Sequence, residues 1–127
     1  MQLKITAPHI SRYQRTDQLI LDGGIRAQHY NAEGRPTDWL TAQSGEVFER
    51  ERRIMAYGNV ILHSDSGMVL YADTLIYNPK IDKVTSDGFV IIVTPTDSIS
   101  GYGLKAATDL STWQIHNTSG ATWREIE

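Results

Sequence analysis

Four copies of one apolar pattern, spaced about 30 residues apart, constrain the fold of this chain more than any other feature. The copies align on Ala7, Ala42, Ala72 and Gly101, which lie 35, 30 and 29 residues apart. Within a copy, apolar residues recur at even offsets from this anchor residue. Because successive side chains of a strand point to opposite faces, residues at even offsets share a face. Each copy therefore predicts one strand–turn–strand unit with one apolar face.

Polar segments divide the chain at regular intervals and predict the turns. Segments 14–17, 49–52 and 78–82 have turn composition within the copies, and 31–34, 64–67 and 95–97 separate one copy from the next. About eight strand segments in antiparallel succession follow, and no window has convincing helical periodicity. We predict an all-β fold over residues 1–127 as a single domain. Its architecture is an open twisted β-jelly-roll or two-sheet sandwich, built from about four strand–turn–strand repeats.

Glycine recurs sixteen residues after the anchor in the first three copies, as Gly23, Gly58 and Gly88, while the fourth copy has Asn117 there. A glycine within a strand weakens it and commonly marks a bulge or a sharp bend. We therefore expect these glycines to bend long strands from one sheet toward an opposing sheet. Together with the anchor Gly101, they are the predicted structural glycines.

The apolar face of the repeats is expected to point inward. For most β proteins such a stripe is simply packed core, and the pattern alone favours that interpretation. The inward stripe is predicted to comprise Leu19, Leu21, Ile25, Leu40, Ile54, Val60, Leu62, Leu70, Val84, Val90, Ile92 and Ile99.

Composition argues against several functional classes. The formal net charge is −3 and no cationic run occurs, so a nucleic-acid partner is not expected. The chain has no cysteine, and its four histidines, His9, His29, His63 and His116, are dispersed as surface or strand residues without metal-ligand spacing. Ser100 lacks the glycine pattern of a nucleophile elbow, and the carboxylates fall mainly in predicted turns. We predict no metal, no cofactor and no enzymatic activity.

Seven short segments of the chain follow one another in a characteristic order and spacing, namely 34–36, 39–42, 45–48, 55–60, 72–79, 84–87 and 99–106. Each segment is weakly specific by itself, but their succession is specific. Together they resemble the LptC family of lipopolysaccharide-export proteins across nearly the whole chain.

This resemblance implies a non-enzymatic periplasmic domain that binds lipopolysaccharide through its lipid A acyl chains. Lipid would come from an inner-membrane ABC transporter and pass through an apolar trough, lined by the inward stripe, to a periplasmic bridge protein. The first strand, with Leu3 and Ile5, would contact the transporter subunits. The last strand, near 112–123 with Trp113 and Ile115, would contact an LptA-like bridge protein. Family members are tethered to the inner membrane by an N-terminal helix. We expect that helix to be absent from this chain, whose longest apolar run is only 89–93.

Other interpretations remain open from the sequence. The sister LptA family shares the repeat and would make this chain a soluble periplasmic bridge protein. A structural β-repeat interaction module, or a β enzyme acting on polysaccharides, is also compatible with an all-β chain. Open sheet edges could further support an edge-to-edge homodimer.

Overall fold

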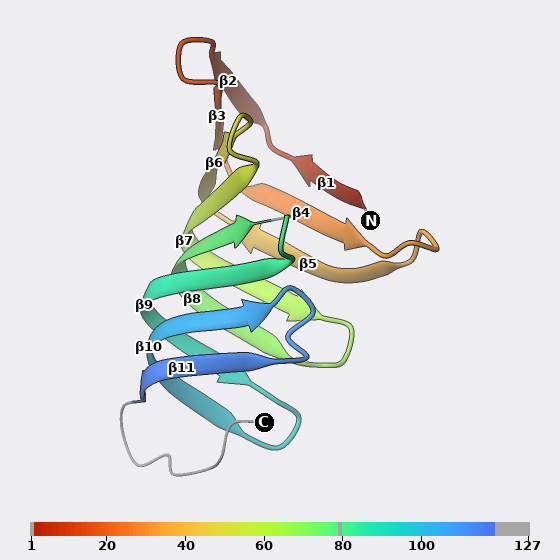
Figure 1. Cartoon of the computed structure of the whole chain (residues 1–127), viewed down its shortest axis with the longest axis vertical. Coiled ribbons are helices and arrows are strands. Elements are labelled where there is room, and N and C mark those ends of the chain that lie inside the picture. The colour runs from red at the N-terminus through yellow and green to blue at the C-terminus, as the bar shows by residue number, and fades with distance from the viewer. Residues whose placement is uncertain (1, 79, 119–127) are drawn as a thin grey trace.

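A computed structural model describes residues 2–78 and 80–118, which form eleven antiparallel strands and no helix (Figure 1). The all-β prediction is therefore confirmed. The strands are β1 (Gln2–Thr6), β2 (His9–Tyr13), β3 (Gln18–Asp22), β4 (Ile25–Tyr30), β5 (Pro36–Ala42), β6 (Ser44–Phe48), β7 (Arg53–Ser64), β8 (Val69–Asn78), β9 (Lys83–Val93), β10 (Ser98–Ala107) and β11 (Trp113–Thr118).

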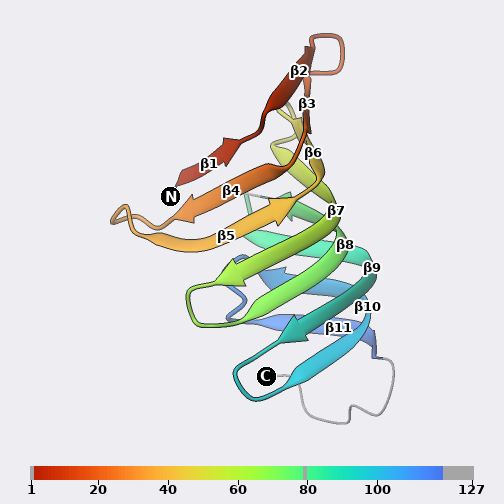
Figure 2. The ribbon, with the colours of Figure 1, turned by 180° about the vertical axis from the view of Figure 1, so that it is seen from behind.

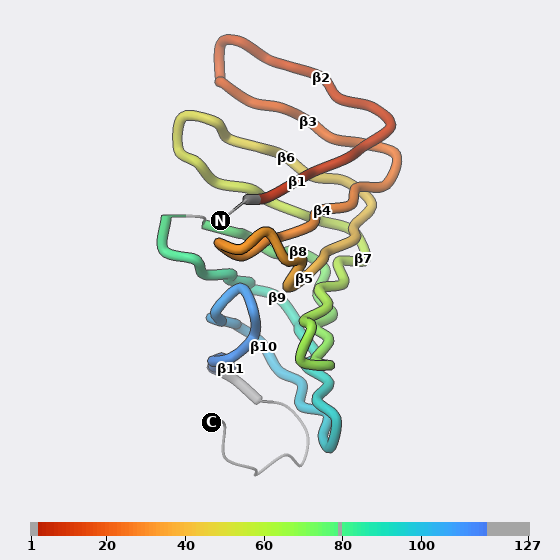
Figure 3. Tube along the Cα trace, turned by 90° about the vertical axis from the view of Figure 1, so that its right-hand side faces the viewer, coloured from red at the N-terminus to blue at the C-terminus, as the bar shows by residue number. Residues whose placement is uncertain are grey.

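The eleven strands form eight lines that follow one another in chain order. Strands β1 and β2 make the first line, β4 and β3 the second, and β5 and β6 the third, after which β7 to β11 each make one line. The expected eight segments thus correspond to eleven strands, because short breaks divide the first three lines. Figure 3 shows the lines succeeding one another along the long axis, from the red N-terminal end to the blue C-terminal end. The molecule is an antiparallel meander in four strand–turn–strand units.

The first seven lines break or shift register part-way along their length, and these bends align into one crease (Figure 2). In β7 the register shifts between Tyr57 and Val60, and Gly58 has a φ of 81°. Backbone hydrogen bonds connect neighbouring bends, since the Gln43 N–H donates to the Gly58 carbonyl over 2.8 Å. The crease folds the meander into two facing layers.

The predicted glycines take different places along this crease. Gly23 lies between β3 and β4 rather than inside a strand, and Gly88 lies in the irregular middle of β9. Gly101 is buried and regularly paired with Val90, whereas the bend of β10 falls at Gly103, with a φ of 80°. The repeat position alone did not identify Gly103, because the fourth copy departs from the spacing of the others.

The inner faces of the two layers form continuous rows of apolar side chains across the strands. In one layer Leu40 pairs with Leu62, Leu62 with Leu70, and Leu70 with Ile92, which in turn pairs with Ile99. Such cross-strand neighbours lie about 5 Å apart and exclude water together. The even-offset stripe of the sequence is therefore the interior of the folded meander.

The two halves of the molecule along its long axis differ in how fully their interior is packed. In the half nearer the C-terminus, Leu70, Val90 and Ile92 have no solvent exposure. The β10–β11 turn adds Leu110, which is fully buried although it adopts a left-handed φ of 62°. The Ser64 hydroxyl, at the end of β7, donates to the Asp109 carbonyl of this turn over 2.9 Å. The turn thus closes the open side of the C-terminal half.

The two edges of the meander are its first and last lines. Among the described residues, β1 pairs only with β4, β2 only with β3, and β11 only with β10. These edges match the expected ones in place, although the sequence expectation for the last strand extended to Trp123, which lies outside the described residues. One side of each edge strand therefore has no partner within the part of the chain described here.

Candidate functional site

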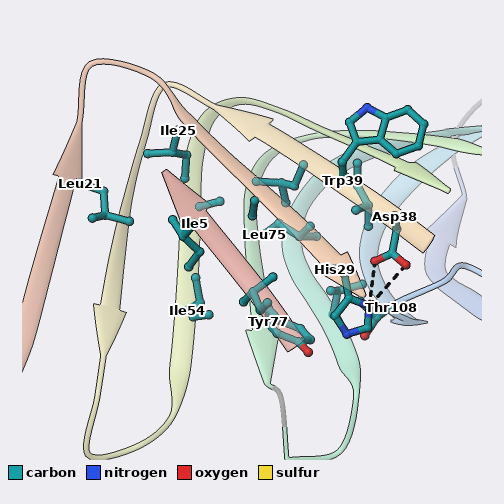
Figure 4. Close-up of a pocket in the computed structure, with 16 residues that line it drawn as sticks. Ile5, Leu21, Ile25, His29, Asp38, Trp39, Ile54, Leu75, Tyr77 and Thr108 are labelled. Atoms are coloured by element: carbon teal, nitrogen blue, oxygen red, sulfur yellow. Dashed lines mark hydrogen bonds and ion pairs between the residues drawn. The ribbon is translucent and has the colours of Figure 1, made fainter. Parts of the chain in front are cut away.

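A narrow cavity lies between the two layers in the N-terminal half of the molecule (Figure 4). Its volume is about 50 Å³. The walls are almost entirely apolar and come from strands of both layers. The lining residues are Leu3, Ile5, Leu21, Ile25, Ala27, His29, Asp38, Trp39, Leu40, Ile54, Ala56, Leu62, Leu75, Tyr77, Val84 and Thr108.

Relative to the cavity, the twelve predicted inward residues fall into three sets. Six of them line it, namely Leu21, Ile25, Leu40, Ile54, Leu62 and Val84. Five others, Val60, Leu70, Val90, Ile92 and Ile99, are buried in the hydrophobic core outside the cavity lining. The remaining one, Leu19, is half-buried and pairs with Val47 on β6.

The predicted edge residues are likewise divided. Leu3 and Ile5 of β1 form part of the cavity wall, so this edge strand belongs to the site. On β11, Ile115 is buried in the core and Trp113 packs against it, away from the cavity. The N-terminal edge thus adjoins an open interior, whereas the C-terminal edge adjoins a packed one.

Trp39 differs from the other lining residues because its indole points away from the cavity (Figure 4). It stacks on His63 with a centroid separation of 4.9 Å and an interplanar angle of 9° on the outer surface. Only the base of this side chain can therefore contribute to the cavity wall.

A buried polar pair interrupts the apolar lining at one end of the cavity. His29 of β4 and Asp38 of β5 are cross-strand partners with 7% and 2% exposure. The His29 Nδ1 atom lies 3.3 Å from Asp38 Oδ2, and the Thr37 hydroxyl donates to Asp38 Oδ1 over 2.7 Å. Such partners allow the pair to remain in an apolar interior.

The opposite layer brings its own polar groups toward this pair. The His29 Nε2 atom is buried, has no hydrogen-bond partner, and lies 4.0 Å from Asp82 Oδ1. Thr108 donates from its hydroxyl to the same Asp82 oxygen over 2.8 Å. The Tyr77 ring meets the His29 ring edge-on with a centroid separation of 6.1 Å. His29 thus faces groups from both layers.

Burial alters the acidity of the ionisable groups beside the cavity. Burial raises the pKa of Asp38 above its ordinary value, although Thr37 and His29 oppose the shift. Burial, together with the negative charges of Asp82 and Asp38, raises the pKa of Tyr77 to about 12. Burial thus shifts the pKa of both groups upward.

Sequence reasoning treated His29 as an ordinary surface or strand residue and did not single out Asp38 or Tyr77. A signal was nevertheless present. His29 lies two residues after Ala27, and Asp38 lies two residues before Leu40, so both occupy inward positions of the apolar stripe. Polar residues at such positions are candidates for buried hydrogen-bonded pairs or ligand contacts.

Two further features concern the class of site. Within residues 2–78 and 80–118, no three acidic, histidine or cysteine side chains gather as a metal site would require. The same part of the chain contains no helix long and apolar enough to cross a membrane.

The fold and the cavity together define an open β-jelly-roll whose interior is apolar and incompletely filled at one end. The family model for lipopolysaccharide-assembly, LptC-related proteins matches residues 1–122. The chain therefore belongs to the LptC-related family, whose role is lipopolysaccharide transport and whose β domain is periplasmic. No curated protein matches the sequence significantly.

Proposed function

We propose that this protein holds acyl chains of lipopolysaccharide between its two layers and passes them along the transport machinery without catalysing a reaction. The observation that carries the proposal is the apolar cavity between the layers in the N-terminal half. An acyl chain of about 12 methylenes costs on the order of 10 kcal/mol to expose to water, at roughly 0.8 kcal/mol per methylene. Transport of lipopolysaccharide through an aqueous space therefore requires a protein that covers its acyl chains with apolar side chains.

Entry of an acyl chain requires the layers to separate. The cavity of about 50 Å³ is well below the roughly 300–1,000 Å³ of typical small-molecule sites. The edge strand β1 is the wall that can move at the smallest cost. It has five residues, pairs only with β4 among the described strands, and contributes Leu3 and Ile5 to the lining. We expect lipid to enter by displacement of β1.

Transfer requires partners at the two edges. We propose that the transporter subunits pair with the β1–β2 edge and supply lipid to the adjoining cavity. A bridge protein would pair with β11, since unpaired edge strands accept a further strand through main-chain hydrogen bonds. The adjoining core would then have to open for lipid to reach the bridge, because the residues next to β11 are fully packed.

Photo-crosslinking can test the β11 contact. A crosslinking residue at exposed Gln114 on β11 should capture the bridge protein, because an added strand would lie about 5 Å away. Thr85 on β9 is the matched control. Lys105 on β10 pairs with both Gln114 and Thr85, so Thr85 lies at the same level of the sheet but two strands away from the edge strand. Adducts that form equally at both positions would argue against strand pairing at β11.

Native mass spectrometry of the purified chain tests the lipid proposal. The chain is mixed separately with lipopolysaccharide and with a phospholipid of similar acyl length. We expect a one-to-one complex with lipopolysaccharide and much weaker retention of the phospholipid. Replacement of the cavity residue Ile54 by Asp should abolish the complex, whereas replacement of exposed Ile81 by Asp should preserve it. Indifference to both lipids would contradict the proposal.

A further inference from the structure

The apolar cavity contains one buried nitrogen whose hydrogen-bonding capacity is unused. His29 Nε2 is buried without a partner, and the His29 side chain is only 8% exposed. Buried polar atoms are nearly always paired, so an unpaired one at a cavity wall is a candidate contact for a polar group of a ligand. The other ring nitrogen is already held beside Asp38.

The position of Asp82 defines what that group can be. Its Oδ1 atom lies 4.0 Å from Nε2, which is too long for a direct hydrogen bond. An oxygen atom beside the line between them can lie about 2.8 Å from both. A hydroxyl suits this position because it both donates and accepts. It can donate to neutral Nε2, or accept from protonated Nε2 while donating to Asp82.

The surroundings define what carries the hydroxyl. Apart from His29, Asp38, Tyr77 and Thr108, the cavity wall consists of apolar side chains, among them Leu3, the cross-strand partner of His29 on β1. A carboxylate or phosphate at the gap would bring a second negative charge against Asp82, which an uncharged hydroxyl avoids. The ligand suited to this gap is therefore an aliphatic chain in the cavity with one uncharged polar group between His29 and the partly exposed Asp82.

We propose that the His29–Asp82 gap is a specificity site for an acyl chain bearing a hydroxyl group. The proposal rests on the proposed function, because it names the kind of chain that the cavity prefers. Unsubstituted chains can enter the same apolar slot but leave Nε2 unpaired. Discrimination then follows from the buried nitrogen, since an apolar wall alone distinguishes chains only weakly.

Matched fatty acids test this inference by isothermal titration calorimetry on the whole chain. Octadecanoic acid and 12-hydroxyoctadecanoic acid differ only in a hydroxyl that lies far from the carboxylate, so their affinity ratio isolates the contribution of the hydroxyl. We expect the hydroxylated chain to bind about threefold to tenfold more tightly to the wild type, the range of one neutral hydrogen bond. The His29→Phe variant should bind both acids equally and retain affinity for octadecanoic acid.

A second variant keeps the test valid if the His29→Phe variant fails to fold. His29→Phe leaves Asp38 buried without its partner, so the double variant His29→Phe with Asp38→Leu replaces the whole pair by apolar groups of similar size. It too should lose the preference. Equal binding of both acids to the wild type, as expected if solvent satisfies Nε2, would overturn the inference but not the proposed function. A preference that survives in both variants would also overturn it, and failure to bind either acid would contradict both proposals.

Discussion

Single residues at the crease decide whether the meander can fold in two. Gly58 adopts a φ of 81°, and a Cβ atom there would lie 2.5 Å from Gln43 Oε1 and 2.8 Å from Gln43 Cβ. Gly58→Ala therefore adds backbone strain and a clash with the neighbouring line. We expect a loss of about 1–3 kcal/mol in the free energy of unfolding, measured by urea denaturation.

Gly88 is the matched control for this prediction. It lies in the same crease, but its φ is outside the left-handed region and a Cβ atom would have no neighbour within 4 Å. Gly88→Ala should stabilise the protein by about 0.4–1 kcal/mol, because it restricts only the unfolded chain. Equal losses for the two variants would show that the crease does not depend on a left-handed residue.

Tyr77 gives the stability of the protein a predictable dependence on alkaline pH. Its folded-state pKa of about 12 exceeds the ordinary value of 10.0, so its contribution is complete below pH 10. That contribution is lost as pH rises from 10 to 12, because the unfolded state releases the proton first. Urea unfolding at pH 8, 10 and 11 should show wild type losing stability relative to Tyr77→Phe above pH 10. Parallel curves would contradict the shift.

At the scale of single residues, the sequence predicted the features that depend only on the alternation of side chains along a strand. It predicted the inward stripe from Leu19 to Ile99, because alternation follows directly from strand geometry. It could not separate Leu40, beside a cavity, from Val90, in packed core, because both occupy equivalent inward positions. That difference depends on how the side chains of the facing layer fill the space at each position, which alternation along one strand does not specify.

At the scale of elements, each of the four turns within the repeats contains one residue with a left-handed backbone conformation. The turns differ in whether that residue is buried. Asp17, Arg52, Asp82 and Leu110 each adopt a left-handed φ between 51° and 62°. The first three are polar residues at the open side of the molecule. Only Leu110 is apolar and fully buried, so the fourth turn closes its half of the interior while the others leave theirs open.

Removal of the Leu110 side chain tests that role. Leu110→Ala should lower the free energy of unfolding by about 2–5 kcal/mol, because it creates a cavity in packed core. Ile81→Ala, in the preceding turn and 61% exposed, should change it by no more than about 0.5 kcal/mol. Guanidinium denaturation of both variants provides the comparison, and a negligible loss for Leu110→Ala would show that the turn is not part of the core.

Elements were predicted well where the repeat was regular and less well where it diverged. The eight lines and most turns follow from composition and alternation. The breaks at Ala7–Pro8, Gly23–Gly24 and Gln43 divide three lines, and a periodic pattern continues unchanged across such breaks. In the last copy the bend falls at Gly103, two residues after the predicted Gly101. A bend can move by a few residues while the facing strand adapts.

The whole molecule is one meander folded along one crease, with an edge at each end of the chain. Its topology follows chain order, so every strand pairs with near neighbours, and among residues 2–78 and 80–118 the two unpaired edges are the first and last lines. The same inward stripe forms a packed core in the C-terminal half and an apolar cavity in the N-terminal half. Membership of the LptC-related family connects this interior to lipopolysaccharide transport.

A crosslinking scan along β7 tests most directly whether that interior receives lipid. A photo-reactive residue is placed in turn at each position from Arg53 to Tyr57, in the presence of lipopolysaccharide. Ile54 and Ala56 line the cavity, and their neighbours along the strand point to the opposite face. We predict lipid adducts at Ile54 and Ala56 and none at Arg53, Met55 and Tyr57. Adducts of equal yield at all five positions, or confined to the outward three, would contradict lipid binding between the layers.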